Sequence, residues 1–254
     1  MPAADLLAVF AHPDDESLLA GGTIAACAAA GLKVGIASLT RGELGPIATP
    51  GVAREQLGEE RARELEAATR ELGAAWSECL TLPDGDLQSA EASGEALAAC
   101  RALVESTAPR ALLTFGPEGL YWHPDHIATH RVVRAARPAG AEVYELTWPA
   151  GLVPRIHAEL RRRRRDGDLW GIEPAAFGAD PADIVAELDV TPFLACKLRA
   201  LRCHRTQLHA GHLLEELPED LVRELLGREW LCAPADHRWL TELVHSSGRE
   251  RAGR

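Results

Sequence analysis

Short apolar runs alternate with amphipathic stretches along the first 150 residues of the chain. The strand-like runs lie at 6–11, 34–40, 79–82, 111–116 and 142–148. Helical patterns follow the first four runs, at 17–30, 55–72, 95–106 and 125–137. Apolar runs that are separated by helices need crossover connections, which give a parallel sheet covered on both faces. The pattern therefore predicts a doubly wound α/β fold with a mainly parallel sheet.

The regularity weakens after Trp148. We expect helices near 153–165, 192–204 and 218–227 and a strand near 183–190. No internal repeat or Ser/Gly linker marks a boundary, and 254 residues suit one large domain. We therefore interpret residues 1–254 as a single domain, with a core at about 1–150 and a C-terminal extension at about 151–254 that closes over the sheet and its site.

Composition and charge narrow the choice of partners. The chain is 46% hydrophobic and 26% charged, which is typical of a globular protein that folds alone. Its formal net charge of -11 repels phosphate backbones and anionic lipid, so we expect neither nucleic acid nor a membrane as the principal partner. The arginine run at 161–165 is interpreted as a solvated helix face. A small molecule is the expected partner, and self-association into a homo-oligomer stays open.

The cysteines and the N-terminus bear on the cellular compartment. Six cysteines are scattered without a C-x-x-C pair, which is typical of buried thiols in a reducing cytosol. The charged stretch "HPDDE" interrupts the apolar N-terminus, and no run of about 18 uncharged apolar residues follows. We expect a cytoplasmic protein.

Four polar loops follow the first four predicted strands. They are "HPDDE" (12–16), "TRGELG" (40–45), "PDGD" (83–86) and "GPEGLYWHPDH" (116–126). In open parallel sheets, ligands bind at the carboxyl ends of the strands, where such loops meet. We expect these four loops to form one rim and to hold the functional site.

The tripeptide His-Pro-Asp occurs twice on this rim, at 12–14 and 123–125, and the second copy continues to His126. Two histidines and a carboxylate are a common ligand set for catalytic zinc, which leaves a fourth position for water. His12 and Asp15 stand three residues apart across a tight turn and can face one ion. The spacing therefore favours a zinc site shared by the two loops.

The carboxylates of the first loop admit two explanations. Asp14 cannot point the same way as Asp15, so it is free to act as a general base beside the water that zinc activates. Alternatively, Asp14, Asp15 and Glu16 merely favour a helix N-terminus. Capping explains neither His12 nor the second motif at 123–126, so we favour the metal site.

The same residues carry a resemblance to a known family. "AHPDDE" after the first strand and "HPDH" after a later one resemble the LmbE/PIG-L family of zinc-dependent deacetylases, which remove acetyl from N-acetylglucosamine-type substrates on a Rossmann-like fold. The match extends to "LTRGELG", "GEERARELEAATRELG", "LPDGDL" and "KLRALRCHRTQ" and covers most of the first 210 residues. It therefore implies an N-deacetylase that acts on an amino sugar or its conjugate.

The resemblance implies a role for each matching position. It implies that His12, Asp15 and His126 hold one zinc ion per chain and that Asp14 is the general base. Iron (Fe²⁺) can occupy such a site, because the order of affinities alone does not fix the metal.

The second motif and its neighbours complete the implied site. His123 would stabilise the oxyanion or protonate the leaving amine, and Asp125 would hold its imidazole. Tyr121 matches a tyrosine near the carbonyl oxygen. Arg61, Glu43 and Arg41 are expected to bind the sugar. A simple glycine turn with exposed charges would also explain the rim loop that carries Arg41 and Glu43. Asp84 has a simpler explanation as the start of an Asp-Gly turn.

Other classes of protein fit less well. The chain contains no G-x-S-x-G elbow of a serine hydrolase, and the glycines near residue 21 do not form a G-x-G-x-x-G dinucleotide motif. A second metal at His204, His209 and His212 is disfavoured because no carboxylate completes the spacing. A catalytically inactive metal- or nucleotide-binding regulatory module remains the alternative, but binding zinc alone requires neither Asp14 nor His123.

Overall fold

A single twisted sheet organises the molecule. The computed structural model describes residues 1–165, 167, 171–208, 212–233 and 236–252, and within these ranges seven strands form one sheet in the order β3-β2-β1-β4-β5-β7-β6. The strands are β1 (Leu6–Phe10), β2 (Val34–Thr40), β3 (Trp76–Leu82), β4 (Ala111–Phe115), β5 (Glu142–Thr147), β6 (Ala186–Asp189) and β7 (Arg228–Ala233).

The first five strands are parallel, and their order reverses on the two sides of β1. Every residue of β1, β2 and β4 is buried, as expected for parallel strands with both faces covered. β7 pairs antiparallel with β5 and with β6. The predicted doubly wound, mainly parallel α/β fold is therefore confirmed, with an antiparallel pair added at one edge.

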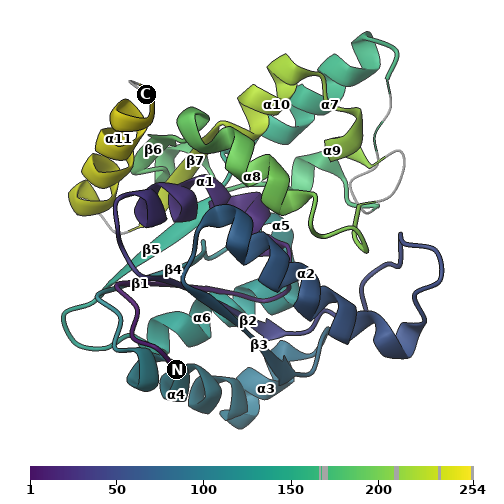
Figure 1. Cartoon of the computed structure of the whole chain (residues 1–254). Coiled ribbons are helices and arrows are strands. Elements are labelled where there is room, and N and C mark those ends of the chain that lie inside the picture. The colour runs from purple at the N-terminus through teal and green to yellow at the C-terminus, as the bar shows by residue number, and fades with distance from the viewer. Residues whose placement is uncertain (166, 168–170, 209–211, 234–235, 253–254) are drawn as a thin grey trace.

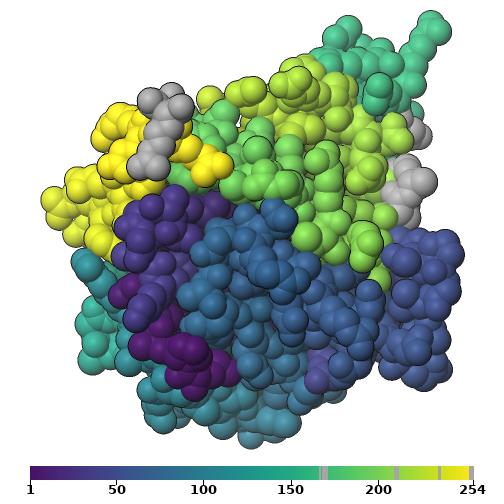
Figure 2. Space-filling view, in the orientation of Figure 1, coloured from purple at the N-terminus to yellow at the C-terminus, as the bar shows by residue number. Residues whose placement is uncertain are grey.

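Helices cover both faces of the sheet (Figure 1). On one face lie α1 (Asp15–Ala29), α2 (Leu57–Leu72), α8 (Leu194–Leu201) and α11 (Arg238–Ala252), and on the other lie α3 (Leu87–Ser93), α4 (Glu95–Thr107) and α6 (Pro124–Ala136). The remaining helices are α5 (Gly119–Trp122), α7 (Leu152–Arg162), α9 (Leu213–Glu216) and α10 (Glu219–Leu226). Figure 2 shows the C-terminal extension, in green and yellow, resting on the purple and blue N-terminal part. No helix within the described ranges is both long and apolar enough to traverse a lipid bilayer.

Some elements differ from the sequence prediction, and each difference has a local cause. β7 was not predicted, because it begins with two charged residues, Arg228 and Glu229. β3 starts at Trp76 rather than at residue 79, since its half-exposed residues do not form an apolar run. The Trp76 ring lies where a Cβ on Gly35 would be, 2.2 Å from the nearest ring carbon, so the glycine permits the pairing of β2 with β3.

The sequence analysis also missed the helices α3 and α11 and the four-residue helices α5 and α9, and the last predicted strand is shorter than expected. α3 is only seven residues long, and α11 has no strong apolar stripe. The strand predicted at 183–190 begins at Ala186, because residues 181–183 form a 3₁₀ turn whose first amide is capped by the Asp180 carboxylate.

A buried ion pair fastens the extension to the core. Lys197 Nζ lies 2.6 Å from Glu229 Oε1, and both side chains are fully buried. The Glu229 carboxylate also accepts hydrogen bonds from the backbone N–H groups of Gly22 and Thr23 in α1. A Cβ on Gly22 would come within 2.4 Å of Val190, so the glycine allows this close approach. The contacts join α1, α8 and β7 at one buried point.

We expect Lys197→Met to lower the free energy of unfolding by about 3–5 kcal/mol, because it leaves the Glu229 carboxylate buried without its cation. Urea denaturation followed by circular dichroism measures the change. The matched control is Arg199→Met on the same helix, whose ion pair with Glu71 is exposed and should contribute less than about 1 kcal/mol. Equal stability of the two variants would contradict the assigned role of the buried pair.

Candidate active site

Three predicted metal ligands converge at the carboxyl ends of β1 and β4. His12 follows β1, Asp15 begins α1, and His126 lies in the first turn of α6. His126 Nε2 lies 3.3 Å from His12 Nδ1 and 3.4 Å from Asp15 Oδ1, and His12 Nδ1 lies 3.4 Å from Asp15 Oδ2. All three residues are buried. Their donor atoms therefore face one point, although 111 residues separate Asp15 from His126.

The opposite nitrogens of the two imidazoles have partners of their own. His12 Nε2 lies 3.1 Å from Asp84 Oδ1 and 3.3 Å from Asp125 Oδ2. His126 Nδ1 lies 3.0 Å from the carbonyl oxygen of Gly119. Metal-binding histidines characteristically donate their second N–H to a carboxylate or a backbone carbonyl. The surroundings thus leave His12 Nδ1 and His126 Nε2 as the atoms that could bind a metal ion.

The electrostatics of the group also suit a cation. Burial works against protonation of His12, but hydrogen bonds to Asp125, Asp15 and Asp84 raise its pKa well above the ordinary value. Burial opposes the ionised form of Asp15, but the neighbouring imidazoles of His126 and His12 lower its pKa overall. Burial lowers the pKa of His126 to about 3, which keeps this ligand neutral. The carboxylates around His12 make this position favourable for a positive charge. Two imidazoles with one carboxylate are also a donor set that fits zinc.

Asp14 is held in a strained backbone beside these ligands. Its φ is 125°, in the region that favours glycine, and its side chain makes no capping hydrogen bond to α1. Burial raises the pKa of Asp14 to about 6, although Arg61 lowers it. Leu120 and Trp122, which flank Tyr121, also have positive φ angles, of 67° and 64°. Strain of this kind persists where the surrounding structure holds it and often accompanies function.

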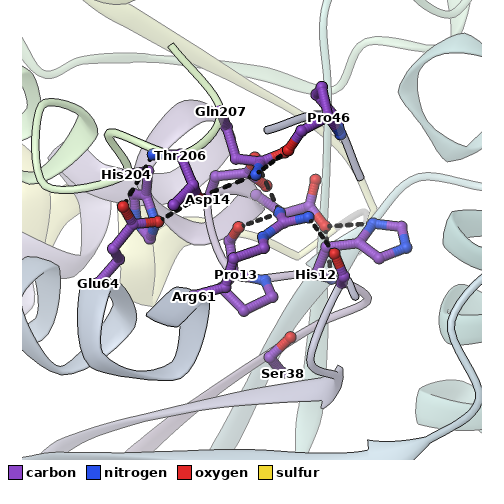
Figure 3. A network of polar contacts seen from close by, with 12 residues as sticks. His12, Pro13, Asp14, Ser38, Pro46, Arg61, Glu64, His204, Thr206 and Gln207 are labelled. Atoms are coloured by element: carbon purple, nitrogen blue, oxygen red, sulfur yellow. Dashed lines mark hydrogen bonds and ion pairs between the residues drawn. The ribbon is translucent and has the colours of Figure 1, made fainter. Parts of the chain in front are cut away.

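Arg61 holds Asp14 in place (Figure 3). Its buried guanidinium donates Nη1–H to the carbonyl oxygen of Gly42 at 2.8 Å and Nη2–H to that of Pro13, and Nη2 lies 3.1 Å from Asp14 Oδ2. A Cβ on Gly42 or on Gly45 would lie 2.3 or 2.6 Å from Arg61 Nη1, so both glycines make room for this side chain. Arg61 lines the cavity, but these contacts direct it toward the protein rather than toward a sugar.

His123 and Tyr121 stand on the cavity side of the ligands. The His123 ring stacks on that of His126, with centroids 4.5 Å apart, and Tyr121 meets the His126 ring edge to face. Burial lowers the pKa of His123, and it raises that of Tyr121 well above its usual value. Both side chains line the cavity. The pKa shifts favour a protonated Tyr121 phenol and a neutral His123 imidazole.

Asp125 occupies a different position from the one expected. Its carboxylate accepts hydrogen bonds from the backbone N–H groups of Gly85 (2.7 Å) and Leu87 (3.0 Å) and faces His12. Only the backbone N–H of Asp125 reaches His123 Nδ1, at 3.2 Å. The expectation that Asp125 holds the His123 imidazole through its side chain is therefore corrected. As the second residue of α6, Asp125 points across the rim toward the loop after β3.

The loop after β3 contributes a residue that the sequence interpretation undervalued. Asp84, which was explained as a turn residue, contacts His12 Nε2 and accepts a hydrogen bond from the Leu44 backbone N–H at 2.6 Å. Glu43 accepts from the Asp84 backbone N–H at 3.3 Å, and Arg41 pairs with Glu59. Neither Glu43 nor Arg41 lines the cavity. The available signal for Asp84 was its place on the same rim.

The C-terminal histidines do not form a second metal site in the described structure. His204 Nε2 lies 2.8 Å from Glu16 Oε1, and His212 Nδ1 accepts a hydrogen bond from the Leu214 backbone N–H. His209 lies outside the described residues. Across the described part of the chain, both groups with the spacing of metal ligands contain His12; one is His12, Asp15 and His126, and the other is His12, His123 and Asp125.

A cavity of about 320 Å³ opens beside the ligands. Asp14, His123, Tyr121 and Arg61 line it together with His12 and Asp15, and the extension contributes further walls from α8, α9 and their flanking loops. Two imidazoles and a carboxylate around one point, with the Asp14 carboxylate beside them and a cavity in front, form a group that could hold a metal ion next to a bound small molecule.

Comparison with known proteins identifies the family. Residues 7–137 match the family described as PIG-L, GlcNAc-PI de-N-acetylase. The chain belongs to the PIG-L family, as its motifs indicated. All the predicted metal ligands lie within the matched residues.

Individual relatives agree with this assignment. A 1D-myo-inositol 2-acetamido-2-deoxy-alpha-D-glucopyranoside deacetylase of Streptomyces avermitilis is 34% identical and covers 91% of this chain and 92% of its own length. The solved structure of the conserved protein TT1542 of Thermus thermophilus is 31% identical, with a TM-score of 0.54 over 80% of each chain. The N,N'-diacetylchitobiose deacetylase of Pyrococcus horikoshii, at 21% identity, shares the fold with a TM-score of 0.55 over 86% of this chain and 73% of its own.

Metal analysis of purified protein tests the ligand set. We expect about one divalent ion per chain and loss of that ion in His126→Ala, because a ligand is removed. Asp84→Asn should retain the site but weaken zinc binding on the order of tenfold, since it removes a charged partner of His12 Nε2. His245→Ala, at an exposed position in α11, is the control and should bind normally. Full metal content in His126→Ala would contradict the assignment.

Proposed function

We propose that this protein is a metal-dependent N-deacetylase that hydrolyses the acetamide of an N-acetylglucosamine-type sugar or conjugate. The observation that carries the proposal is the convergence of His12, Asp15 and His126 beside Asp14 at one end of a cavity. The named activities of the relatives support the same reaction on a small amino-sugar substrate.

His12, Asp15 and His126 would hold the ion, with zinc as the metal that their donor set fits best. Bound zinc lowers the pKa of water and polarises a carbonyl oxygen. The chain supplies the proton chemistry. Asp14, with a pKa raised to about 6 in the metal-free protein, is suited to accept a proton from the attacking water. Arg61 keeps its carboxylate in position.

The rest of the reaction requires charge stabilisation and one proton for the amine. Water adds to the acetyl carbon, the carbon–nitrogen bond breaks, and acetate and a free amine leave. His123 and Tyr121 line the cavity as donors for the developing oxyanion. The leaving nitrogen gains a proton from Asp14, which has just accepted one, or from His123, which must first take up a proton because its lowered pKa favours the neutral imidazole. These are the two groups that the sequence interpretation also named.

A catalytically inactive binding module is the weaker explanation. Holding a metal requires the three ligands, but it does not require a strained aspartate with a dedicated arginine partner. Asp14 has a φ of 125° and an ion pair with a buried guanidinium. Such an arrangement costs stability and suits a residue that handles protons.

We expect Asp14→Asn to lower kcat for acetate release by about 10²-fold or more, because the amide cannot accept the proton from water. The variant should keep its metal, since Asp14 is not a ligand. Acetate release and metal content are measured on the same preparation. Normal turnover with normal metal content would remove Asp14 from the reaction.

Substitutions of Arg61 can distinguish a role in positioning Asp14 from a role in binding the substrate. We expect Arg61→Met to lower kcat by up to about 10²-fold with little change in KM, because Asp14 loses the partner that orients it. Arg61→Lys should recover part of the rate, since it restores a cation beside Asp14. Steady-state kinetics give both constants. A rise in KM at unchanged kcat would instead assign Arg61 to the substrate, as the family resemblance implied.

A further inference from the structure

One wall of the cavity is apolar. Six of its lining residues, here called the apolar wall, come from the loop after β2 and from the C-terminal extension: Leu44, Pro46, Ile172, Leu201, Leu208 and Leu214. The polar lining comes mainly from the loops after β1, β3 and β4. Polar groups in such cavities fix the reacting end of a ligand, and apolar walls accept the rest of it.

The polar side chains beside the apolar wall offer few exposed groups to a ligand. Gln207 Nε2 donates one hydrogen to the carbonyl oxygen of Pro46 at 3.1 Å and the other to Thr206 Oγ1 at 2.9 Å (Figure 3). His204 Nε2 faces Glu16, and its Nδ1 atom has no hydrogen-bond partner but is itself buried, so a ligand in the cavity does not meet an exposed donor or acceptor there. Hydroxyl groups placed against this part of the cavity would lose water without gaining partners among the described side chains.

Two exposed apolar side chains stand near the same cavity. Leu44 belongs to the apolar wall and is 66% exposed, and Trp122 is 64% exposed between Tyr121 and His123, which line the cavity. The other exposed large apolar side chains in the described ranges, Met1 and Val185, are less exposed, at 48% and 38%. Large apolar groups left in water beside a site commonly mark the surface that a ligand covers.

The charge of the cavity disfavours an acidic ligand. Asp14, Asp15 and Asp84 line it, and Arg61 is the single arginine or lysine among the described lining residues. The Arg61 guanidinium is committed to Asp14 and to two carbonyl oxygens. A carboxylate or phosphate on the ligand would therefore meet like charge without a free cationic partner.

We propose that the apolar wall binds an apolar aglycone, an alkyl or aryl group on the anomeric oxygen of the N-acetylglucosamine unit. This inference rests on the proposed function for the sugar and goes beyond it in naming the aglycone class. It sets this protein apart from relatives whose named substrate carries inositol, a cyclohexane ring with a hydroxyl on every carbon.

A matched pair of substrates tests the proposal. Cyclohexyl and myo-inositol glycosides of N-acetylglucosamine have aglycone rings of the same size and differ in hydroxyl groups. We expect kcat/KM for acetate release to be about tenfold or more higher for the cyclohexyl glycoside, the magnitude that small apolar contacts supply. Equal turnover, or faster turnover of the inositol glycoside, would overturn the apolar aglycone and leave the deacetylase function intact.

Variants of the wall localise the effect. Leu208→Gln and Leu44→Gln change partly and largely exposed side chains, so both variants should fold. Each should lower the ratio of kcat/KM for the cyclohexyl glycoside to that for the inositol glycoside by several-fold. Leu243→Gln, a partly exposed leucine of α11 outside the cavity, is the matched control and should leave the ratio unchanged. An unchanged ratio in both wall variants would count against the assignment.

A binding measurement separates this inference from the reaction. Calorimetry at several temperatures with the deacetylated cyclohexyl and inositol glucosaminides gives the heat capacity change of binding, which becomes more negative as apolar surface is buried. We expect the more negative value and the tighter binding for the cyclohexyl compound. The reverse order would overturn the inference. Absence of acetate release from every glycoside, with this binding order present, would overturn only the proposed deacetylase function.

Discussion

The site depends on His12 having different neighbours on its two ring nitrogens. Nδ1 faces Asp15 and His126, and Nε2 faces Asp84 and Asp125. One imidazole at the end of β1 thus connects the loops after β1, β3 and β4. A parallel sheet makes this convergence feasible, because the carboxyl ends of neighbouring strands lie along the same edge. The order β3-β2-β1-β4, with β1 central, places His12 between its partners.

The C-terminal extension completes the cavity that the parallel sheet begins. The buried pair of Lys197 and Glu229 fixes α8 against α1, and the segment after α8 then carries His204 and Gln207 to the cavity. Thr206 is held by Glu64 of α2 through both its backbone N–H and its hydroxyl. The extension is therefore fixed to the core on two sides of the cavity. Its apolar residues are held in place as part of the cavity wall.

The features that could be predicted from the sequence are those that depend on the periodicity of apolar residues and on short motifs. The parallel strands and most helices follow from apolar runs, and the grouping of His12, Asp15 and His126 followed from repeated motifs on predicted rim loops. β7 was not predictable in this way, because Glu229 is buried by pairing with Lys197 rather than by being apolar. Likewise, no local pattern shows that the donors of Arg61 are directed to backbone carbonyls and to Asp14, 47 residues earlier.

The reacting end and the aglycone end of the site differ in how much of each the family model covers. The predicted metal ligands, Asp14 and the His123 segment lie within residues 7–137, which match the family. Ile172, Leu201, Leu208 and Leu214 lie beyond them, in the extension. The proposed chemistry at the acetamide thus belongs to the part of the chain that matches the family model, and the proposed aglycone contacts come largely from outside it, with Leu44 and Pro46 as the exceptions. Substrate preference can therefore change in the extension without disturbing the geometry around His12.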